Sequence, residues 1–199
     1  MIEALGQNPD KYQGRFIVVE IGPGGKHRSL LKDLSLPEEQ EPLYLAVDPE
    51  GENLDIHQKK NSPSPAVMKA SITDPAFYHD RDLDGQVDRV FVFNVLSIAG
   101  TSSLPHFKRL FSEKIRSILK RGGKAYVAEW LTPGTMQEIL DFKYEDYGLE
   151  ARIVRDSEEV KKILKEEGIS KNRRKSIAAS FDSLEPQVTP FLLVLTKKE

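Results

Sequence analysis

Near the start of the chain, a run of β-forming residues leads directly into a glycine-rich turn. Residues 16–19 read Phe-Ile-Val-Val, the acid Glu20 follows, and the turn then holds Gly22, Gly24 and Gly25. Glycine adopts positive φ readily and lets a ligand approach closely, because it has no Cβ. The helix expected after the turn would offer free N–H groups to polar ligand atoms. This pattern is typical of the turn at which an α/β protein meets a nucleotide.

The turn does not match the common phosphate-binding patterns. A dinucleotide site needs G-x-G-x-x-G, but the third glycine position here is His27, which is too large for close helix–sheet packing. A phosphate loop needs Ser or Thr after its Gly-Lys pair, whereas Lys26 is followed by His27 and the upstream glycine is absent. A polyphosphate ligand is therefore disfavoured. Two interpretations remain open: a nucleoside site, or a tight turn of some other α/β fold.

Composition excludes several kinds of site. The chain has 199 residues, enough for one domain with a substantial core. It has no cysteine, which excludes structural disulfides, thiolate metal ligands and cysteine nucleophiles. The four histidines are dispersed without metal-ligand spacing, so we expect no metal site. The 29 basic and 31 acidic residues nearly balance, so the overall charge argues neither for nor against a nucleic-acid partner.

The hydropathy pattern favours a cytoplasmic protein. Residues 1–13 lack the basic region followed by an apolar one that marks a signal peptide. No apolar run approaches the ~20 residues of a membrane-spanning helix. We therefore expect no membrane contact.

Apolar runs of strand length alternate with segments of helical periodicity. Strands are predicted at residues 16–20, 43–47, 66–69, 87–93, 124–130, 149–154 and 191–196. Helices are predicted at residues 30–34, 104–120, 135–147 and 156–167. The nearly continuous apolar run at 87–93 is typical of a strand covered on both faces. The alternation predicts an α/β fold: a doubly wound, mostly parallel seven-stranded sheet flanked by helices, in a single domain over residues 1–199.

The end signals of three segments carry further predictions. Gly122 and Gly123 are expected to end the helix at 104–120, and Gly148 the helix at 135–147. Asp156 and Glu159 form a capping-box-like start for the last helix. That helix opens an insert at 156–189, whose basic run at 171–175 is predicted to be a solvated loop.

Several segments resemble class I S-adenosylmethionine-dependent methyltransferases, in the order that this family has them. Residues 20–25, Glu-Ile-Gly-Pro-Gly-Gly, resemble the family's first motif, acid-x-Gly-x-Gly-x-Gly, with Lys26 at the last position. Residues 87–97 are similar to the fourth-strand motif, residues 119–127 to the glycine-pair turn before the fifth strand, and residues 191–196 to the closing strand. The resemblance covers about residues 14–155 and 190–197, after an N-terminal segment at 1–14. It implies an antiparallel last strand.

The resemblance implies that S-adenosylmethionine binds at the carboxyl ends of the strands. Asp48 follows the second strand, where the family places an acid on the ribose hydroxyls, and one carboxylate can accept from two vicinal hydroxyls. Asp48 before Pro49 is also an ordinary turn former, and Glu20 would either bind the cofactor or order the turn through backbone N–H groups. The cofactor-binding candidates are Glu20, Gly22, Gly24, Gly25, Asp48, Pro49, Ser71, Ile72, Asn94 and Leu96.

Three residues at the same edge are substrate-facing candidates, namely Ser97, Glu129 and Trp130. Glu129 would act as a substrate carboxylate or a general base, and Trp130 as a platform for the substrate; both also have a purely structural interpretation. No catalytic base is assigned, because methyl transfer needs positioning more than a dedicated base.

The chain departs from the family pattern at three places. The 26 residues from Gly22 to Asp48 exceed the ~20 that are typical of nucleotide-binding α/β units. Ala70-Ser71-Ile72 stands where many members carry an acid near the adenine. The insert before the closing strand replaces a tight hairpin.

The resulting prediction is an S-adenosylmethionine-dependent methyltransferase whose acceptor, more a small molecule than a nucleic acid, is not identified. Residues 94–97 lack the proline pair and aromatic residue that would clamp the exocyclic amine of a nucleic-acid base. The alternatives are a non-catalytic binding or scaffold protein of the same fold, an RNA or protein methyltransferase, and a nicotinamide-dependent oxidoreductase, against which His27 argues. The oligomeric state is left open.

Overall fold

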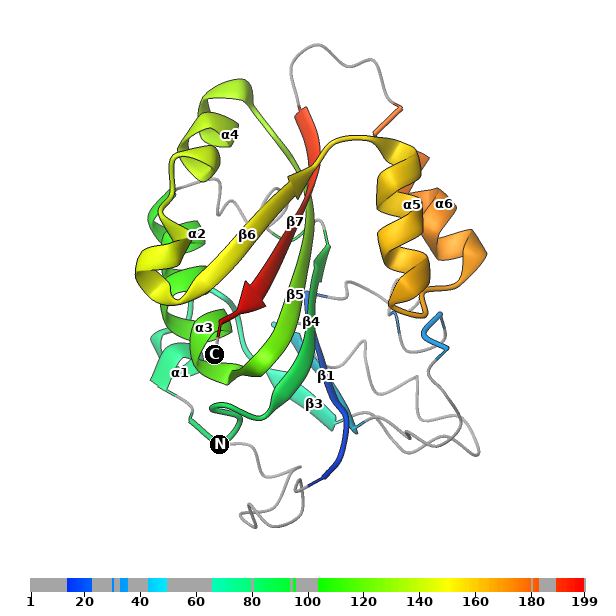
Figure 1. Ribbon diagram of the computed structural model, residues 1–199. Helices are drawn as coiled ribbons and strands as arrows, with labels where there is room; N and C mark the ends of the chain where they lie inside the picture. Colours follow the sequence, from blue (N-terminus) through cyan, green and yellow to red (C-terminus); the bar gives the residue numbers. More distant parts are fainter. Residues whose placement is uncertain are drawn as a thin grey trace.

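The computed structural model describes residues 14–22, 30, 33–35, 43–49, 66–79, 81–93, 95, 104–179, 181–182 and 189–198. Within these ranges it forms a layered α/β structure in which helices cover both faces of one sheet (Figure 1). The α/β class predicted from the sequence is therefore confirmed. The predicted helix at 30–34 lies mostly outside the described residues.

The sheet has the strand order β3-β2-β1-β4-β5-β7-β6. Its strands are β1 (Ile17–Ile21), β2 (Leu43–Asp48), β3 (Ala66–Lys69), β4 (Val87–Phe93), β5 (Leu119–Leu131), β6 (Leu149–Val154) and β7 (Thr189–Lys197). The first five strands pair in parallel, whereas β7 is antiparallel to both β5 and β6. The chain order reverses direction across the sheet between β1 and β4. In open α/β sheets, ligands bind outside the carboxyl ends of the strands at such a reversal.

The helices divide between the two faces of the sheet. One face is covered by α1 (Pro75–His79), the continuous α2 (Leu104–Arg109), η5 (Leu110–Ile115) and α3 (Arg116–Ile118), and then α4 (Pro133–Leu140) and the 3-10 helix η6 (Tyr144–Tyr147). The other face is covered by α5 (Ser157–Glu166) and α6 (Lys171–Ala179), which lie together on the right in Figure 1. Among the described residues, no helix is long and apolar enough to cross a membrane.

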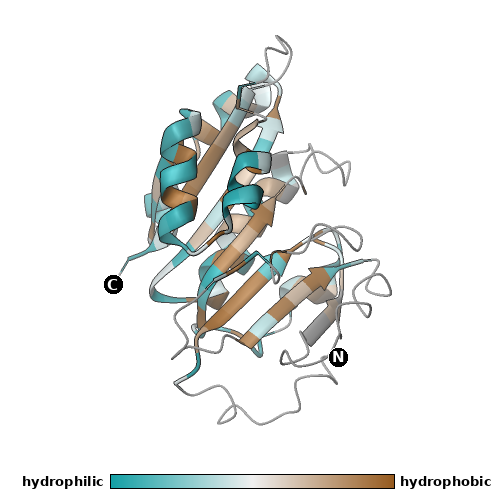
Figure 2. Cartoon of the chain, turned by 90° about the vertical axis from the view of Figure 1, so that its right-hand side faces the viewer, coloured by the Kyte–Doolittle hydropathy of each residue, from teal (hydrophilic) through white to brown (hydrophobic). Residues whose placement is uncertain are grey.

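Side chains alternate between two cores. Along β4, Val90 and Val92 pack under α2 and η5, whereas Phe91 and Phe93 join the core under α5. Six of the seven β4 residues are buried, which explains its continuous apolar run. Figure 2 shows the same division: the strands are mainly hydrophobic, and the helices in front of them turn hydrophilic surfaces outward.

The predicted end of the helix at 104–120 was wrong. The helical segment stops at Ile118, and β5 runs from Leu119 through both glycines that were expected to end the helix. Val87 pairs with Leu119 and Arg89 with Lys124, so residues 120–123 bulge out opposite one residue of β4. Pairing with β4 therefore determines where the helix ends, and the two glycines form part of the bulge.

Gly123 sits in that bulge where a Cβ would meet Val87 O at 2.8 Å. A larger residue would push β4 and β5 apart. The pair of glycines thus marks a close approach between two strands, which is another use of glycine that sequence alone does not distinguish from a helix stop.

The helix predicted at 135–147 is also a correction, because two short helices replace it. Thr132 caps α4 by accepting the Thr135 N–H, and Pro133 starts the helix. After α4 ends, Tyr144 turns into the core and donates its hydroxyl to Ile139 O at 3.2 Å. Gly148 ends the second helix with φ +67°, as predicted.

The basic run at 171–175 is not a loop but the start of α6, which corrects the prediction. Ser170 Oγ accepts the Arg173 N–H at 3.3 Å and thus caps the helix. The Arg174 guanidinium donates to Ile169 O at 2.8 Å, and Ala178 is buried in the core. Burial of Ala178 in the second half of the helix thus stabilises a helix whose first half is basic and exposed to a larger extent. By contrast, α5 begins as predicted, with Asp156 accepting the Glu159 N–H at 2.7 Å.

The turn between α5 and α6 is joined to residues 33–35, which follow the glycine-rich turn in sequence. Ser170 N–H donates to Asp33 O and Ser170 Oγ to Asp33 Oδ1, both at 2.6 Å. Ser35 N–H donates to Gly168 O at 2.8 Å. The insert therefore braces the connection between β1 and β2.

This junction predicts different costs for two glycine substitutions. Gly148 and Gly168 both have positive φ, but a Cβ at Gly148 meets open space, whereas one at Gly168 collides with the backbone of Ser35. We expect Gly148→Ala to cost about 1–2 kcal/mol from backbone strain alone. Gly168→Ala should cost about 1–3 kcal/mol more because of the collision. Urea unfolding of both variants measures the loss of unfolding free energy. Equal losses would show that the close contact between Gly168 and Ser35 does not matter for stability.

Candidate functional site

The candidate site lies at the carboxyl edge of the parallel strands, where the ends of β1, β2, β4 and β5 meet. Ligands of open α/β sheets bind outside this edge, at the point where the chain order reverses. In this sheet the point lies between β1 and β4, which are neighbours. Gly22 follows β1 and Val95 follows β4, so these two residues mark the position.

Glu20 is held inside the protein at the end of β1. Its side chain is 2% exposed. The carboxylate accepts the Leu30 N–H at 3.0 Å and the hydroxyl proton of Tyr44. Glu20 therefore orders the chain that follows the turn through a backbone N–H group, which is one of its two predicted roles. Its contact with a cofactor stays a prediction.

Gly22 is a position where only glycine fits. Its φ is +66°, and its N–H donates to Val47 O at 2.7 Å at the end of β2. A Cβ at this position would lie well within 3.0 Å of one Val95 methyl carbon and 3.1 Å from the other. Gly22, after β1, is thus in direct contact with Val95, after β4.

Several predicted positions lie outside the described residues. They are Gly24, Gly25, Asn94, Leu96 and Ser97. Their roles stay predictions.

Asp48 ends β2 at the same edge, with only 7% of its surface exposed. Pro49 follows it and is exposed. Since Ile21 pairs with Val47, the carboxylate position stands next to the start of the glycine-rich turn. Glu20, Gly22 and Asp48 therefore lie on neighbouring, paired strand ends, and their contact with a cofactor stays a prediction.

Ser71 and Ile72 follow β3 and are engaged within the protein. Ser71 Oγ lies 2.8 Å from Thr73 Oγ1. The Ile72 side chain is buried in the core, and its carbonyl accepts the Tyr78 hydroxyl proton at 2.6 Å. Adenine contact by these two residues stays a prediction.

Tyr78 is buried below this segment, between apolar residues and a cation. Burial raises the pKa of Tyr78 to about 12, and Glu113 adds to the rise, while Arg109 opposes it. The Arg109 guanidinium lies 4.1 Å from the centre of the Tyr78 ring. The neutral hydroxyl is therefore the form that the fold requires.

Glu129 faces the protein interior rather than solvent. Its side chain is fully buried near the end of β5, and its Oε1 accepts the Val95 N–H at 2.5 Å. The next residue, Trp130, points to the opposite face of the sheet by strand alternation and is 40% exposed. Of the two candidates on β5, only Trp130 is open to a substrate in this structure.

Two residues of the site were not among the sequence predictions. Tyr44 contacts Glu20 and Val95 contacts both Gly22 and Glu129. Of these two residues, only Tyr44 could have been identified from the sequence. It lies in an otherwise apolar strand, where its hydroxyl would need a hydrogen-bond partner. Val95 carries no such signal, since an apolar residue after a strand is ordinary.

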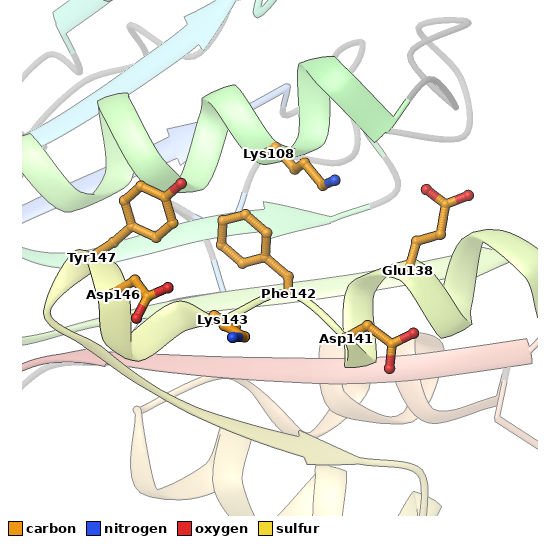
Figure 3. A pocket seen from close by; sticks show the side chains of 7 residues that line it. All are labelled: Lys108, Glu138, Asp141, Phe142, Lys143, Asp146 and Tyr147. Atoms are coloured by element: carbon orange, nitrogen blue, oxygen red, sulfur yellow. The ribbon is translucent and has the colours of Figure 1, made fainter.

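A separate groove of about 430 Å³ lies on the flank of the molecule, between α2 and the α4–η6 segment (Figure 3). The stacked rings of Phe142 and Tyr147 form part of its wall, with centres 5.2 Å apart. Its charged lining residues are Lys108, Glu138, Asp141, Lys143 and Asp146. It contains none of the predicted site residues. Within the described part of the chain, no group of three or more acids and histidines is placed to hold a metal ion.

A scan against protein-family models and a search of the curated proteins each gave no match. Solved structures do match. One is the 16S rRNA (adenine(1408)-N(1))-methyltransferase from Catenulisporales acidiphilia with its cosubstrate SAM, at 17% identity and a TM-score of 0.55, covering 96% of this chain and 92% of that chain. Another is geranyl diphosphate C-methyltransferase from Streptomyces coelicolor A3(2), at 13% identity and a TM-score of 0.56, covering 94% and 76%. The chain has the methyltransferase fold.

A third match shows how variable the acceptor is within this fold. Phosphoethanolamine N-methyltransferase 2 from Haemonchus contortus, solved with S-adenosyl-L-methionine, is 16% identical with a TM-score of 0.51. The match covers 96% of this chain and 51% of that chain. The methyltransferase fold therefore occurs in proteins that act on RNA, on an isoprenoid diphosphate and on a phosphorylated amine.

The Tyr44–Glu20 contact predicts a stability effect. Tyr44→Phe removes one hydrogen bond to a buried carboxylate, which should lower the free energy of unfolding by roughly 1.5–3 kcal/mol. Tyr147→Phe is the matched control, because it removes the hydroxyl of a partly exposed tyrosine that packs on the other face of the sheet from Tyr44. Urea unfolding measures both, and equal midpoints would show that the contact stabilises nothing.

Tyr78 predicts a pH dependence. Its pKa is about 12 in the folded protein and 10.0 as the unperturbed value, so the unfolded chain loses this proton first. The stability that Tyr78 contributes is complete below pH 10 and falls as the pH rises from 10 to 12. The difference in unfolding free energy between wild type and Tyr78→Phe should therefore shrink over this range. A difference that stays constant to pH 12 would contradict the prediction.

Proposed function

We propose that this protein is an S-adenosylmethionine-dependent methyltransferase whose acceptor is a small molecule. The observation that carries the proposal is that Glu20 and Gly22 at the end of β1 lie beside Asp48 at the end of the paired strand β2, next to the point where the chain order reverses. Solved structures of the same fold that contain SAM support the choice of cofactor. In this proposal residues 1–199 form one catalytic domain, and the insert at 156–189 braces it.

The described residues fit this cofactor. Asp48 stands at the end of β2, and a carboxylate at this position can accept hydrogen bonds from both ribose hydroxyls. Gly22 keeps the start of the turn free of a side chain that would displace its neighbours. Glu20 holds Leu30, which places the chain after the turn. Gly24 and Gly25 are the proposed positions of close backbone contact with the cofactor.

The residues of the acceptor side act by positioning. The cofactor supplies an electrophilic methyl group, and transfer to a nucleophile requires an in-line approach more than a strong base. Trp130 is an exposed aromatic residue at the end of β5, on which a flat or apolar acceptor could stack. Asn94, Leu96 and Ser97 are proposed to line the same side, after β4.

RNA is the second candidate acceptor, because of α6. This helix contains four cations and no acid, and Lys171 and Lys175 are exposed. Cations near the start of a helix are unfavourable in the helix dipole, so an anionic partner would compensate for them. The matched ribosomal RNA methyltransferase is compatible with this second choice.

Calorimetric titration with S-adenosylhomocysteine tests the cofactor, with NADH as the parallel ligand. We expect binding of S-adenosylhomocysteine only. Asp48→Ala should weaken this binding by roughly 1.5–3 kcal/mol, the scale of hydrogen bonds to a charged group. Asp146→Ala, which changes an exposed acid in the flank groove, is the control and should bind as the wild type does.

Two results would contradict the proposal. Binding of NADH alone would favour an oxidoreductase, and binding of neither ligand would favour a scaffold protein of this fold. Transfer of radioactive methyl groups to cell extract, with and without ribonuclease, then separates the acceptors. Label in the small-molecule fraction supports the proposal, whereas label that ribonuclease releases supports RNA.

A further inference from the structure

The carboxylate of Glu129 is in a position that an apolar residue would normally occupy. On the same face of β5, Val127 and Leu131 are buried in the core under α2 and α4. Glu129 lies between them and is fully buried. A buried carboxylate is costly unless polar partners surround it, so an acid here needs a reason that packing does not provide.

The hydrogen bond to Val95 gives that reason. Glu129 Oε1 accepts the Val95 N–H at 2.5 Å, a short bond of the charge-assisted kind. The bond joins a rigid central strand to the turn that follows the neighbouring strand β4. A Leu or Val at position 129 would fill the space but leave this N–H without its acceptor.

Val95 also packs against Gly22, the residue that follows β1. One of the Val95 methyl carbons lies well within 3.0 Å of the position that a Cβ of Gly22 would take, and the other lies 3.1 Å from it. Gly22 also donates its N–H to Val47 O near the end of β2. A shift of Val95 would therefore change the packing around Gly22.

We propose that Glu129 is a positioning residue that, through its hydrogen bond to the Val95 N–H, fixes the position of Val95 after β4 relative to Gly22 at the start of the cofactor turn. The proposal rests on the proposed function, because it assigns the turn at Gly22 to the cofactor and residues 94–97 to the acceptor. In this proposal Glu129 acts through the backbone of its neighbour, in place of the roles of general base or substrate carboxylate predicted from its position at the strand end.

Variants at position 129 separate positioning from packing. Glu129→Gln keeps an oxygen that can accept the Val95 N–H, whereas Glu129→Leu keeps the volume and loses the acceptor. We expect Glu129→Leu to weaken S-adenosylhomocysteine binding at least about tenfold, and Glu129→Gln to recover most of that loss. Calorimetry at a temperature where all three proteins are folded measures this. Wild-type affinity in folded Glu129→Leu would overturn the proposal.

The Gly22–Val95 contact has its own test, which needs no ligand. Gly22→Ala should destabilise the wild-type protein strongly, but less so in a Val95→Ala background, because Val95→Ala removes the colliding methyl groups. Thermal unfolding of the four proteins gives the coupling between the two positions. If the changes in stability caused by the two substitutions simply add, the packing of Val95 against Gly22 is wrong.

A third measurement keeps the inference separate from the proposed function. The Val95 amide proton should resonate at unusually low field in wild type, shift upfield in Glu129→Leu and move less in Glu129→Gln. If these shifts and the coupling appear while the wild type fails to bind S-adenosylhomocysteine, the proposed function is wrong and the link between the turns stands. If the wild type binds but the Val95 amide is unaffected by Glu129→Leu, the positioning role is wrong.

Discussion

Buried carboxylates that accept backbone N–H groups hold the strand ends and loops of this protein in place. The three pairs are Glu20 with Leu30, Glu129 with Val95, and Asp88 with Ile17. Each acid is itself buried, and a buried charge without partners would be costly. Each N–H belongs to another segment of the chain, so one side chain on a rigid strand determines where that segment lies.

This arrangement explains why the edge between β1 and β4 is suited to a ligand. The parallel strands end together there, and the strand order reverses between β1 and β4, which is where ligands of open α/β sheets bind. Glu20 and Glu129 lie on opposite faces of the sheet, and each accepts an N–H on its own side, from Leu30 and from Val95 respectively. Gly22 and Val95 pack against each other at the ends of β1 and β4.

The sequence was most informative where local and tertiary preferences agree. The strands at 66–69, 87–93 and 149–154 were predicted with the bounds that the structure has. Predictions failed where distant pairing overrides local periodicity: the pairing of Leu119 with Val87 ends a helix that its apolar face would continue. The basic run at 171–175 looked solvated because its anchors, the Ser170 cap and the buried Ala178, lie outside it.

By itself, the sequence determined the α/β class, the strand that delivers Glu20 to a glycine-rich turn, and the acid at the end of β2. These features are local, because they depend on the order of residues along one strand and its turn. Only the tertiary structure decided what the acids do. In the folded chain Glu129 accepts the Val95 N–H, and Glu20 accepts a hydrogen bond from the Tyr44 hydroxyl. Sequence cannot predict these partners, because they depend on which groups the fold brings close together. The tertiary structure also made Gly22 obligatory, since the methyl groups that exclude a side chain there come from a residue 73 positions away.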